Sequence, residues 1–508
     1  MEEFNGILTL LTFFPLVGVL LLLVLGWAGR KDDELVKRVA VITSVITFLI
    51  SLWLLALYNA SESGLQLADR FVWIETLNIS YFLAVDGLSI LMILLTTFIS
   101  MLAISGSWTQ IGEQVRPYYI FMLLLEAGML GVFLAQDLFL FYIFWEFTLV
   151  PMYFLIGIWG GSNRVYASIK FFLYTMAGSL LMLLAILYLG ITYDTFSLPE
   201  LIASANFPLT VGRWLFLGFA IAFAIKVPLF PFHSWLPDAH TEAPTAGSII
   251  LAGILLKMGT YGFIRFNLPL FPEASAFFAP TIAVLAIIGI IYGAIVSFAQ
   301  TDVKRLVAYS SVSHLGFVML GIFSLNNAGI QGAILQGVNH GLSTGALFYL
   351  VGVLYEKRHT REMDAFGGIW RAMPIFSALS LIITLSSMGL PGLNGFVGEF
   401  TILLGSMNAS PDVLAPQPWI YTAFATSGVI LAAVYLLWMY QRVFMGPLDN
   451  PENMTLQDVN AGQLAIMLSF LLFIVWIGIY PSPYFNLMND TVASLVSHVS
   501  GAVTAMVP

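Results

Sequence analysis

Long apolar runs separated by short polar segments make up most of the chain. Fourteen of these runs are close to the length, about 20 residues, that an α-helix needs to cross a membrane. They lie near residues 7–27, 36–58, 86–106, 117–135, 137–159, 165–190, 211–232, 242–264, 276–299, 304–324, 328–354, 373–407, 418–441 and 461–480. The pattern predicts an all-α polytopic membrane protein of about fourteen transmembrane helices, with residues 59–85 as an external loop.

The composition narrows the possible classes further. Hydrophobic residues make up 59% of the 508 positions and charged residues only 9%, which is too few charges for the surface of a soluble protein. The net charge of -9 is too dilute and too acidic for nucleic-acid binding. The chain has no cysteine, which excludes disulfides and thiolate metal sites. No Rossmann or P-loop pattern is present, so we expect this chain to bind no nucleotide. We also expect no cofactor and no metal in this chain.

The distribution of basic residues predicts the topology, because lysine and arginine collect in cytoplasmic loops. One set of alternate loops holds thirteen of them: Arg30, Lys31, Lys37, Arg38, Arg116, Arg164, Lys304, Arg305, Lys357, Arg358, Arg361, Arg371 and Arg442. The opposite set holds three: Arg70, Arg213 and Arg265. This asymmetry favours an even number of spans with both termini outside.

Ionisable residues also lie inside the predicted spans, where a charge at a helix centre costs about 2.5–3.5 kcal/mol on insertion scales. They are Glu126, Glu146, Lys170, Lys226, Lys257 and Glu399, together with His314 and His340, whose ordinary pKa is near neutral. Such residues mark ion or proton pathways more often than they serve packing. We therefore take them as candidates for the functional site.

Each candidate also has a structural interpretation. Lys170 lies near the start of its span and could snorkel to the interface as readily as serve a function. Glu126 could be a partner for a neighbouring helix. Lys226, Lys257 and Glu146 could form one inert ion-pair cluster. A buried lysine–glutamate pair is, however, also a switchable proton site, because moving one charge changes the protonation of its neighbour.

Prolines predict that two spans are broken next to buried charges. Pro228 and Pro231 follow Lys226 directly, and Pro391 stands among glycines just before Glu399. Irregular backbone at membrane depth survives only where protein or a water-filled cavity satisfies it, so we expect local hydration at both breaks. The alternative is that each break is a kink used only for packing.

A weak internal repeat accompanies these breaks. A shift of 164 residues places residues 133–163 on 297–327 without gaps and places the first broken span on the second. The shift separates five predicted spans from the next five, and an odd number inverts the second copy across the membrane. The predicted organisation is residues 1–116 with three helices, 117–266 as the first repeat, 276–446 as the inverted second repeat, and 447–508 with the last helix and a tail.

Several longer motifs carry a family resemblance. The stretch from His233 to Phe266 reads HSWLPDAHTEAPTAGSIILAGILLKMGTYGFIRF and resembles the antiporter-like proton-translocating subunits of respiratory complex I. The resemblance covers nearly the whole chain through VDGLSI at 85–90, FWEFTLVPMYFLIGIWGG at 144–161, SFAQTDVKRLVAYSSVSHLGF at 297–317 and LPGLNGFVGE at 390–399. The M-type (chain 4) members fit better than the L-type ones, because this chain has Lys257 and ends 28 residues after its last predicted span.

The resemblance implies roles for four residues. Glu146 and Lys226 look like the family's carboxylate–lysine pair, which is thought to exchange charge during pumping. Lys257 matches the central lysine of the eighth span, and Glu399 matches the terminal carboxylate of the twelfth. By this resemblance, quinone reduction elsewhere biases a two-state charge arrangement along these four residues, and protons load from the cytoplasmic side and leave outside.

Three histidines, His233, His314 and His340, fall where the family has polar residues along the membrane axis. His233 would share a face with Lys226 if the helix continued through the prolines. With Lys170 and Glu126, these histidines are secondary candidates.

The resemblance also implies partners. They are the L-type and N-type antiporter-like subunits and small helical subunits of the membrane arm, together with the lipid of a bacterial inner membrane, with both termini periplasmic. NADH, FMN, iron–sulfur clusters and quinone then belong to other chains. Two alternatives stay open: a subunit of an Mrp-type sodium/proton antiporter, which would use the same residues, and a structural scaffold or a carrier of another fold, which would tolerate apolar replacements.

Overall fold

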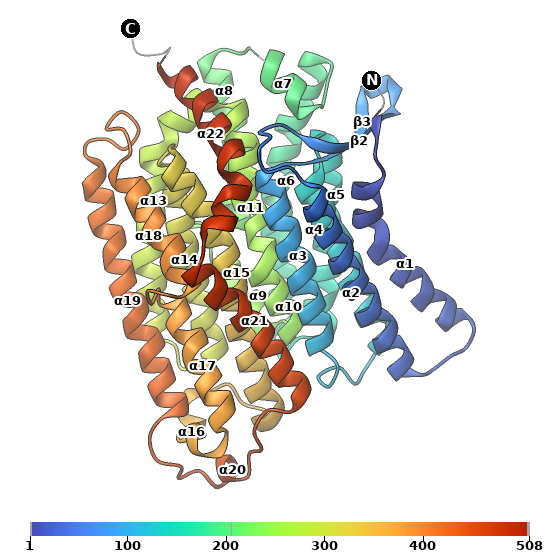
Figure 1. Ribbon diagram of the computed structural model, residues 1–508, viewed down its shortest axis with the longest axis vertical. Coiled ribbons are helices and arrows are strands. Elements are labelled where there is room, and N and C mark those ends of the chain that lie inside the picture. Colours follow the sequence, from blue (N-terminus) through green and yellow to red (C-terminus); the bar gives the residue numbers. More distant parts are fainter. Residues whose placement is uncertain (1–2, 205, 505–508) are drawn as a thin grey trace. The chain divides into compact units, whose positions relative to one another are not determined.

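The computed structural model describes residues 3–204 and 206–504, which are mainly α-helical (Figure 1). Within these residues, twelve helices are long and apolar enough to cross a membrane. They are α1 (Ile7–Trp27), α2 (Asp33–Leu57), α3 (Gly87–Gly106), α4 (Val115–Leu134), α5 (Leu138–Trp159), α6 (Arg164–Tyr193), α8 (Leu209–Lys226), the composite helix Thr245–Leu270, α13 (Pro272–Phe298), α14 (Val303–Ile322), α19 (Pro418–Phe444) and α21 (Ala461–Ile479).

The composite helix consists of α10 (Thr245–Ile250), α11 (Leu256–Gly262) and α12 (Leu268–Leu270), joined by π-helical turns at Leu251–Leu255 and Phe263–Asn267. The remaining helices are α7 (Leu198–Ser204), α9 (Trp235–Glu242), α15 (Asn327–Arg358), α16 (Ile369–Ala372), α17 (Pro374–Ser387), α18 (Asn394–Met407), α20 (Pro451–Met454) and α22 (Ser482–Thr504), with 3-10 turns at Glu75–Leu77 and Met363–Ala365.

The predicted all-α membrane fold is confirmed, and the fourteen predicted spans correspond to twelve apolar helices, one polar helix and one interrupted helix. The predicted span 328–354 is α15, a continuous helix whose interior carries buried polar side chains such as Gln336 and Asn339. The predicted span 373–407 is divided into α17 and α18, of 14 residues each.

The predicted external loop 59–85 contains an antiparallel hairpin, β2 (Gln66–Ile74) and β3 (Ile79–Val85), with β1 (Glu3–Phe4) paired to β2. Asp69 of β2 is fully buried at the start of α1. Its carboxylate accepts hydrogen bonds from the backbone N–H groups of Asn5, Gly6 and Thr9, at 2.6–2.9 Å, and from the Thr9 hydroxyl at 2.7 Å. The hairpin therefore caps the first membrane helix.

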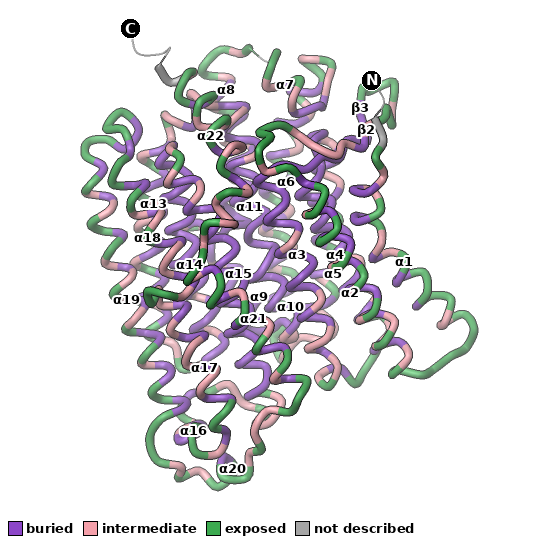
Figure 2. Tube along the Cα trace, in the orientation of Figure 1, coloured by how far each residue is buried: buried purple, intermediate pink, exposed green. Residues whose placement is uncertain are grey.

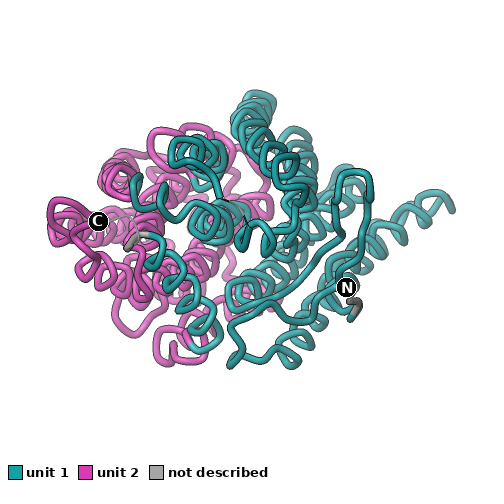
Figure 3. The backbone as a smooth tube through the Cα atoms, turned by 90° about the horizontal axis from the view of Figure 1, so that it is seen from above, with its two compact units in different colours: residues 1–227, 254–278, 486–508 teal, residues 228–253, 279–485 magenta. Residues whose placement is uncertain are grey.

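The chain folds into two compact units (Figure 3). Unit 1 comprises the described residues of Met1–Val227, Ile254–Phe278 and Asn486–Pro508, and unit 2 comprises Pro228–Gly253 and Ala279–Phe485. The 164-residue shift nearly aligns helix starts between them: α5 begins at Leu138 and α14 at Val303, and α6 begins at Arg164 and α15 at Asn327. This agreement supports the repeat, while its inversion and its boundaries stay predictions.

Both α1 and α2 contain many exposed residues (Figure 2), and several of these carry large apolar side chains. Leu20 is 62% exposed and Trp53 is 54% exposed, whereas Thr43 and Ser51 on α2 are buried. A soluble helix places its polar side chains outward and its apolar ones inward. The reverse arrangement is the one that lipid favours.

Arg265 was assigned to an external loop from the sequence, and the structure shows that this assignment is wrong. The side chain lies within the composite helix and is only 10% exposed. It forms a bidentate ion pair with Asp86, the N-cap of α3, at 2.6 and 2.7 Å. Its Nε also donates to the Tyr261 hydroxyl, at 3.0 Å. The carboxylate of Asp86, which follows β3, compensates the charge of Arg265 and so allows this arginine to be buried.

The balance of forces on Asp86 predicts how the pair stabilises the fold. Burial alone raises the pKa of Asp86, but the charge of Arg265 and its hydrogen bonds outweigh burial, so the pKa lies below the ordinary value of 3.8. A group with a lowered folded-state pKa stabilises the fold at higher pH and loses that effect on acidification. The stabilisation by this pair is therefore complete above the ordinary value and is lost as the pH falls below it.

We expect Asp86→Asn to lower the free energy of unfolding by about 3–5 kcal/mol at neutral pH, because it leaves the Arg265 charge buried without its partner. Equilibrium unfolding in mixed detergent micelles measures the change. The control is Glu200→Gln, which removes the partner of Arg70 in a pair whose side chains are 48% and 32% exposed. That change should cost less than about 1 kcal/mol. Equal losses in both variants would contradict a special role for the buried pair.

Candidate functional site

Lys226 is the last residue of α8 and lies where the predicted break occurs. The helix stops there, and residues 227–234 form turns before α9 begins at Trp235. The break predicted from Pro228 and Pro231 is therefore confirmed. The lysine side chain is 1% exposed. A cation at a helix C-terminus is favoured by the helix dipole, by about 0.3–1 kcal/mol.

Aromatic rings rather than hydrogen bonds surround this lysine. Lys226 Nζ lies 5.3 Å from the ring centroid of Trp145 and 5.7 Å from that of Phe171. Among the described residues, Nζ has no hydrogen-bond partner. Ring faces attract a cation but offer it far less than a carboxylate contact does. The ammonium group is thus held in place without being neutralised.

Glu146 follows Trp145 on α5 and is half-buried. Its charge acts on Lys226, yet the described residues contain no ion pair within 4.0 Å between them. Its Oε1 has no hydrogen-bond partner in the described chain, and its charge also acts on Tyr142. The pair is therefore coupled by charge but open, unlike a closed salt bridge.

Lys257 lies on α11, between the two π-helical turns of the composite helix, and is fully buried. Two residues further on, Gly259 packs against the end of α8. A Cβ atom at Gly259 would lie 2.7 Å from the Phe223 carbonyl oxygen and 3.0 Å from the Val227 nitrogen. Only glycine allows this approach, which brings the segment carrying Lys257 beside the end of the helix that carries Lys226. Short π-helical turns are frequent at functional sites.

The two other candidates of unit 1 lie on α6 and α4. Lys170 on α6 is half-buried, with Nζ 5.5 Å from the ring centroid of Tyr166, one turn earlier on the same helix. Glu126 on α4 is fully buried, and neither carboxyl oxygen has a hydrogen-bond partner among the described residues. The interpretation of Glu126 as the partner of a neighbouring polar group thus finds no support.

In unit 2, His314 and Glu399 form a buried pair that sequence reasoning did not connect. His314 Nδ1 lies 2.7 Å from Glu399 Oε1, and Gln336 Nε2 donates to the same oxygen at 3.0 Å. On the other side of the imidazole, the Tyr435 hydroxyl lies 3.1 Å from His314 Nε2. The ring of His340 lies 6.1 Å from that of His314, centroid to centroid. Four helices, α14, α15, α18 and α19, supply these groups.

The predicted break before Glu399 is also confirmed, and polar side chains hold it open. The Ser386 hydroxyl at the end of α17 donates to Asn394 Oδ1 at 2.5 Å, and Asn339 Nδ2 of α15 donates to the Asn394 carbonyl at 2.7 Å. Gly389 adopts a left-handed backbone, with φ of 81°, in the turn between the helices. A Cβ atom there would lie 3.3 Å from Glu399 Oε2, so a larger residue would crowd that buried oxygen.

His233 does not share a helix face with Lys226, because the helix ends at Lys226 and His233 lies in the turn that follows. Its ring packs against Phe230 and Tyr292, with centroids 5.5 and 5.0 Å away. His240, which sequence reasoning did not single out, is fully buried and stacks on Phe348 at 4.6 Å. The signal that could have identified His240 as a candidate is that it is one of only six histidines in the chain.

Lys304 was assigned to a loop, but it is only 7% exposed and lies in the first turn of α14, where its ammonium group donates to the Ala243 carbonyl. Arg361 reaches the neighbouring Thr241 carbonyl at 2.6 Å and pairs with Asp302 at 3.0 Å. The two cations therefore hold the carbonyls that end α9. This cluster was missed because the residues lie more than 50 positions apart along the chain.

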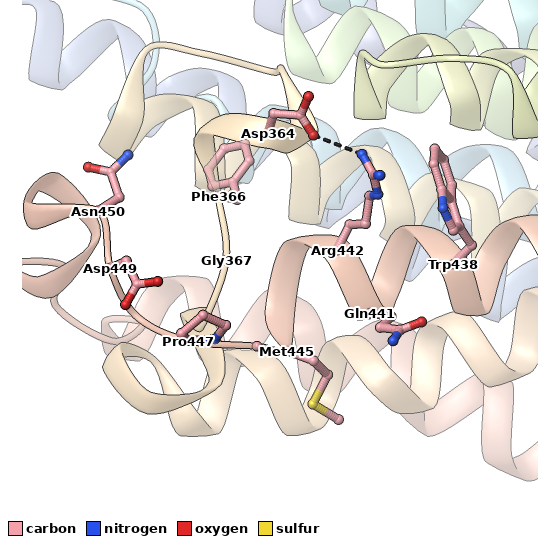
Figure 4. A pocket seen from close by; sticks show the side chains of 11 residues that line it. Asp364, Phe366, Gly367, Trp438, Gln441, Arg442, Met445, Pro447, Asp449 and Asn450 are labelled. Carbon is pink, nitrogen blue, oxygen red and sulfur yellow. Dashed lines mark hydrogen bonds and ion pairs between the residues drawn. The ribbon is translucent and has the colours of Figure 1, made fainter.

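A surface pocket of about 560 Å³ lies in unit 2 at the end of α19 (Figure 4). Its one basic lining residue, Arg442, is already paired with Asp364 at 2.8 Å and lies over the ring of Trp438. The pocket therefore offers an anionic ligand no free cation. Among the described residues, no cluster of three or more His, Asp or Glu side chains could hold a metal ion. The candidate functional groups are therefore the buried ionisable side chains described above, not the residues of this pocket.

The chain is similar to known membrane subunits. Residues 135–417 match the family described as NADH:quinone oxidoreductase/Mrp antiporter, TM. NADH-quinone oxidoreductase subunit M of Rhodobacter capsulatus is 43% identical, over 97% of both chains. A chain in respiratory complex I from Thermus thermophilus with bound NADH is 32% identical, with a TM-score of 0.86 over 97% of this chain and 99% of that one.

A chain of the Mrp complex from a Dietzia species shares the fold, with a TM-score of 0.83 at 18% identity, over 98% of this chain and all of that one. The family resemblance found in the sequence motifs is confirmed. By its matched region, and by its identity to a relative over nearly its full length, the chain belongs to the NADH:quinone oxidoreductase/Mrp antiporter family of membrane subunits and, within it, to the subunit M group.

Proposed function

We propose that this chain is a proton-translocating membrane-arm subunit of a complex I type NADH:quinone oxidoreductase. The observation that carries the proposal is the open pair of Glu146 and Lys226, in which a buried ammonium group at a helix break is coupled by charge to a carboxylate without a salt bridge. Groups held in this way change protonation when a neighbouring charge moves. The group of relatives to which the chain belongs supports the reaction.

The electrostatic interaction within such a pair is large enough to contribute to proton pumping. Two unit charges about 8 Å apart interact by roughly 2 kcal/mol at an effective dielectric constant near 20. Moving one proton against a potential of roughly 150 mV requires about 3.5 kcal/mol. Two or more coupled steps of this size are therefore sufficient. In the proposed cycle, quinone reduction in other subunits biases the charges of Glu146, Lys226 and Lys257.

In unit 2, we assign the terminal proton-transfer step to Glu399. Its partner His314 contacts Glu399 through Nδ1 and the Tyr435 hydroxyl through Nε2. An imidazole with a partner on each nitrogen takes a proton on one side and releases it from the other. Because Glu399 Oε2 has no hydrogen-bond partner among the described residues, it is the oxygen left for water. His340 and His233 have secondary roles in this proposal, as does Lys170 in unit 1.

The assembly follows from the same proposal. The partners are the L-type and N-type antiporter-like subunits and small helical subunits, within a bacterial inner membrane, with both termini periplasmic. NADH, FMN, iron–sulfur clusters and quinone are held by other subunits.

A subunit of an Mrp-type sodium/proton antiporter is the second candidate, since a chain of an Mrp complex has the same fold. Affinity purification of the native chain separates the two: co-purification of NADH-oxidising subunits supports complex I, and their absence from an intact membrane complex supports the antiporter.

We expect Lys226→Ala and Glu146→Gln each to lower proton pumping by at least about tenfold, because each removes an electrostatic coupling of roughly 2 kcal/mol. Pumping is measured as NADH-driven acidification in vesicles containing the assembled complex. The control is Glu75→Gln in the exposed turn of the hairpin, which should pump normally. Full pumping by an assembled Lys226→Ala complex would remove this residue from the mechanism.

Tyr435→Phe tests the imidazole relay. The change removes only the hydroxyl that contacts His314 Nε2, and losing one buried hydrogen bond of about 1–1.5 kcal/mol should slow pumping roughly five- to tenfold. Tyr440→Phe is the matched control, because the Tyr440 hydroxyl on the same helix bonds only the Ser377 carbonyl. The relay assignment fails if the two variants pump at the same rate.

A further inference from the structure

Three buried polar side chains in unit 1 lack partners and are not explained by the proton path above. Glu126 and Tyr119 lie on α4 and Ser100 lies on α3, and all three are 0% exposed. Both oxygens of Glu126 and the hydroxyls of Ser100 and Tyr119 have no hydrogen-bond partner within the described chain. Leaving a buried polar group unsatisfied costs about 1–3 kcal/mol, so such groups are rare and usually meet ordered water. Their placement therefore needs an explanation.

The contact between α3 and α4 places Ser100 and Glu126 at one level. The Ser107 hydroxyl lies 2.9 Å from the Tyr118 hydroxyl, which fixes the register of these consecutive helices. Ser100 precedes Ser107 by seven residues, or two helical turns, and therefore lies on the same face of α3. Two turns forward from Tyr118 is residue 125, next to Glu126. Glu126 on α4 thus lies at the level of Ser100 on the neighbouring α3.

Two contacts of α2 add Thr47 to the same level. The Ser51 and Thr97 hydroxyls lie 2.8 Å apart, so Thr47, one turn before Ser51, lies level with the turn of α3 that follows Thr97 and contains Ser100. Thr43 of α2 and Leu123 of α4 both pack against Gly18. Thr47 lies one turn after Thr43 on α2, and Glu126 lies about one turn after Leu123 on α4. Three independent contacts therefore converge on one place between α2, α3 and α4.

We propose that Glu126, Ser100 and Thr47 form a buried binding site for water and a proton, separate from the Glu146–Lys226 pair. A buried water needs two to four polar partners, and this site supplies three. The Thr47 hydroxyl donates to the Thr43 carbonyl at 2.9 Å, so it accepts from the water. Ser100 donates to the water or accepts from it, and the Glu126 carboxyl group holds the proton.

The route to the surface runs through Tyr119. At 1.5 Å per residue, Glu126 lies about 16 Å into α4 and Tyr119 about 10 Å nearer its start. The two residues are seven apart and share a helix face. Thr43 and Leu123 meet at Gly18 on the parallel helices α2 and α4, so Glu34, in the first turn of α2, lies toward the same end as Tyr119. The Glu34 side chain is 55% exposed. Protons therefore exchange between Glu34 and the site by way of Tyr119 and bridging water.

The site is tested by infrared difference spectroscopy of the purified complex, with Glu126→Gln identifying the carboxyl stretching band by its loss. Ser100→Ala should shift this band, because the carboxyl group loses a partner in its hydrogen-bond network. Ser107→Ala, whose hydroxyl bonds Tyr118 two turns away, should leave the band unchanged. A high-resolution map of the same complex should show ordered water in contact with Ser100 and Glu126. No such water, together with a band unmoved by Ser100→Ala, would overturn the site.

Transfer into D₂O tests the route. The Glu126 band should shift as the proton exchanges, and Tyr119→Phe should slow this exchange at least fivefold. Tyr118→Phe is the matched control, because its neighbouring hydroxyl is bonded to Ser107 and lies off the proposed route. Equal exchange rates in the two variants would exclude Tyr119. None of these readouts depends on pumping, so the site and the proposed function can fail separately.

Discussion

The cost of placing a charge in a low-dielectric interior is the constraint on which this structure depends. A single charge at the centre of a membrane helix costs about 2.5–3.5 kcal/mol on insertion scales, and the net stability of a whole protein is only about 5–15 kcal/mol. The chain can therefore tolerate few buried charges without compensation. Each one found inside the spans has its own local arrangement, which is either closed by a charged partner or open.

Closed and open arrangements illustrate this difference within unit 1. Arg265 is fixed by two hydrogen bonds to Asp86 and one to Tyr261, so neither its charge nor its position can change cheaply. Lys226 has aromatic rings around it and a carboxylate beyond ion-pair distance. A closed pair holds elements together, whereas an open pair responds to its surroundings. A proton pump requires the second kind.

The sequence predicted those features that depend on neighbouring residues. Apolar length identified the spans, and prolines next to Lys226 and Glu399 identified both breaks, because proline acts on its own helix turn. Contacts between distant segments were not predictable: His314 and Glu399 are 85 positions apart, and Arg265 was placed in a loop because nothing near it signals Asp86. The π-helical turns on either side of Lys257 have no composition signal in the sequence.

The two helix breaks stabilise their charged residues by different means. Lys226 is the last residue of α8, where the partial negative charge of the helix end acts directly on it. Glu399 is the sixth residue of α18, beyond the first turn in which the dipole is effective, so the helix end contributes little. His314 and Gln336 take over that role by bonding one carboxyl oxygen. A dipole cannot be withdrawn, but a histidine partner can gain or lose a proton, so the environment of Glu399 is the more adjustable of the two.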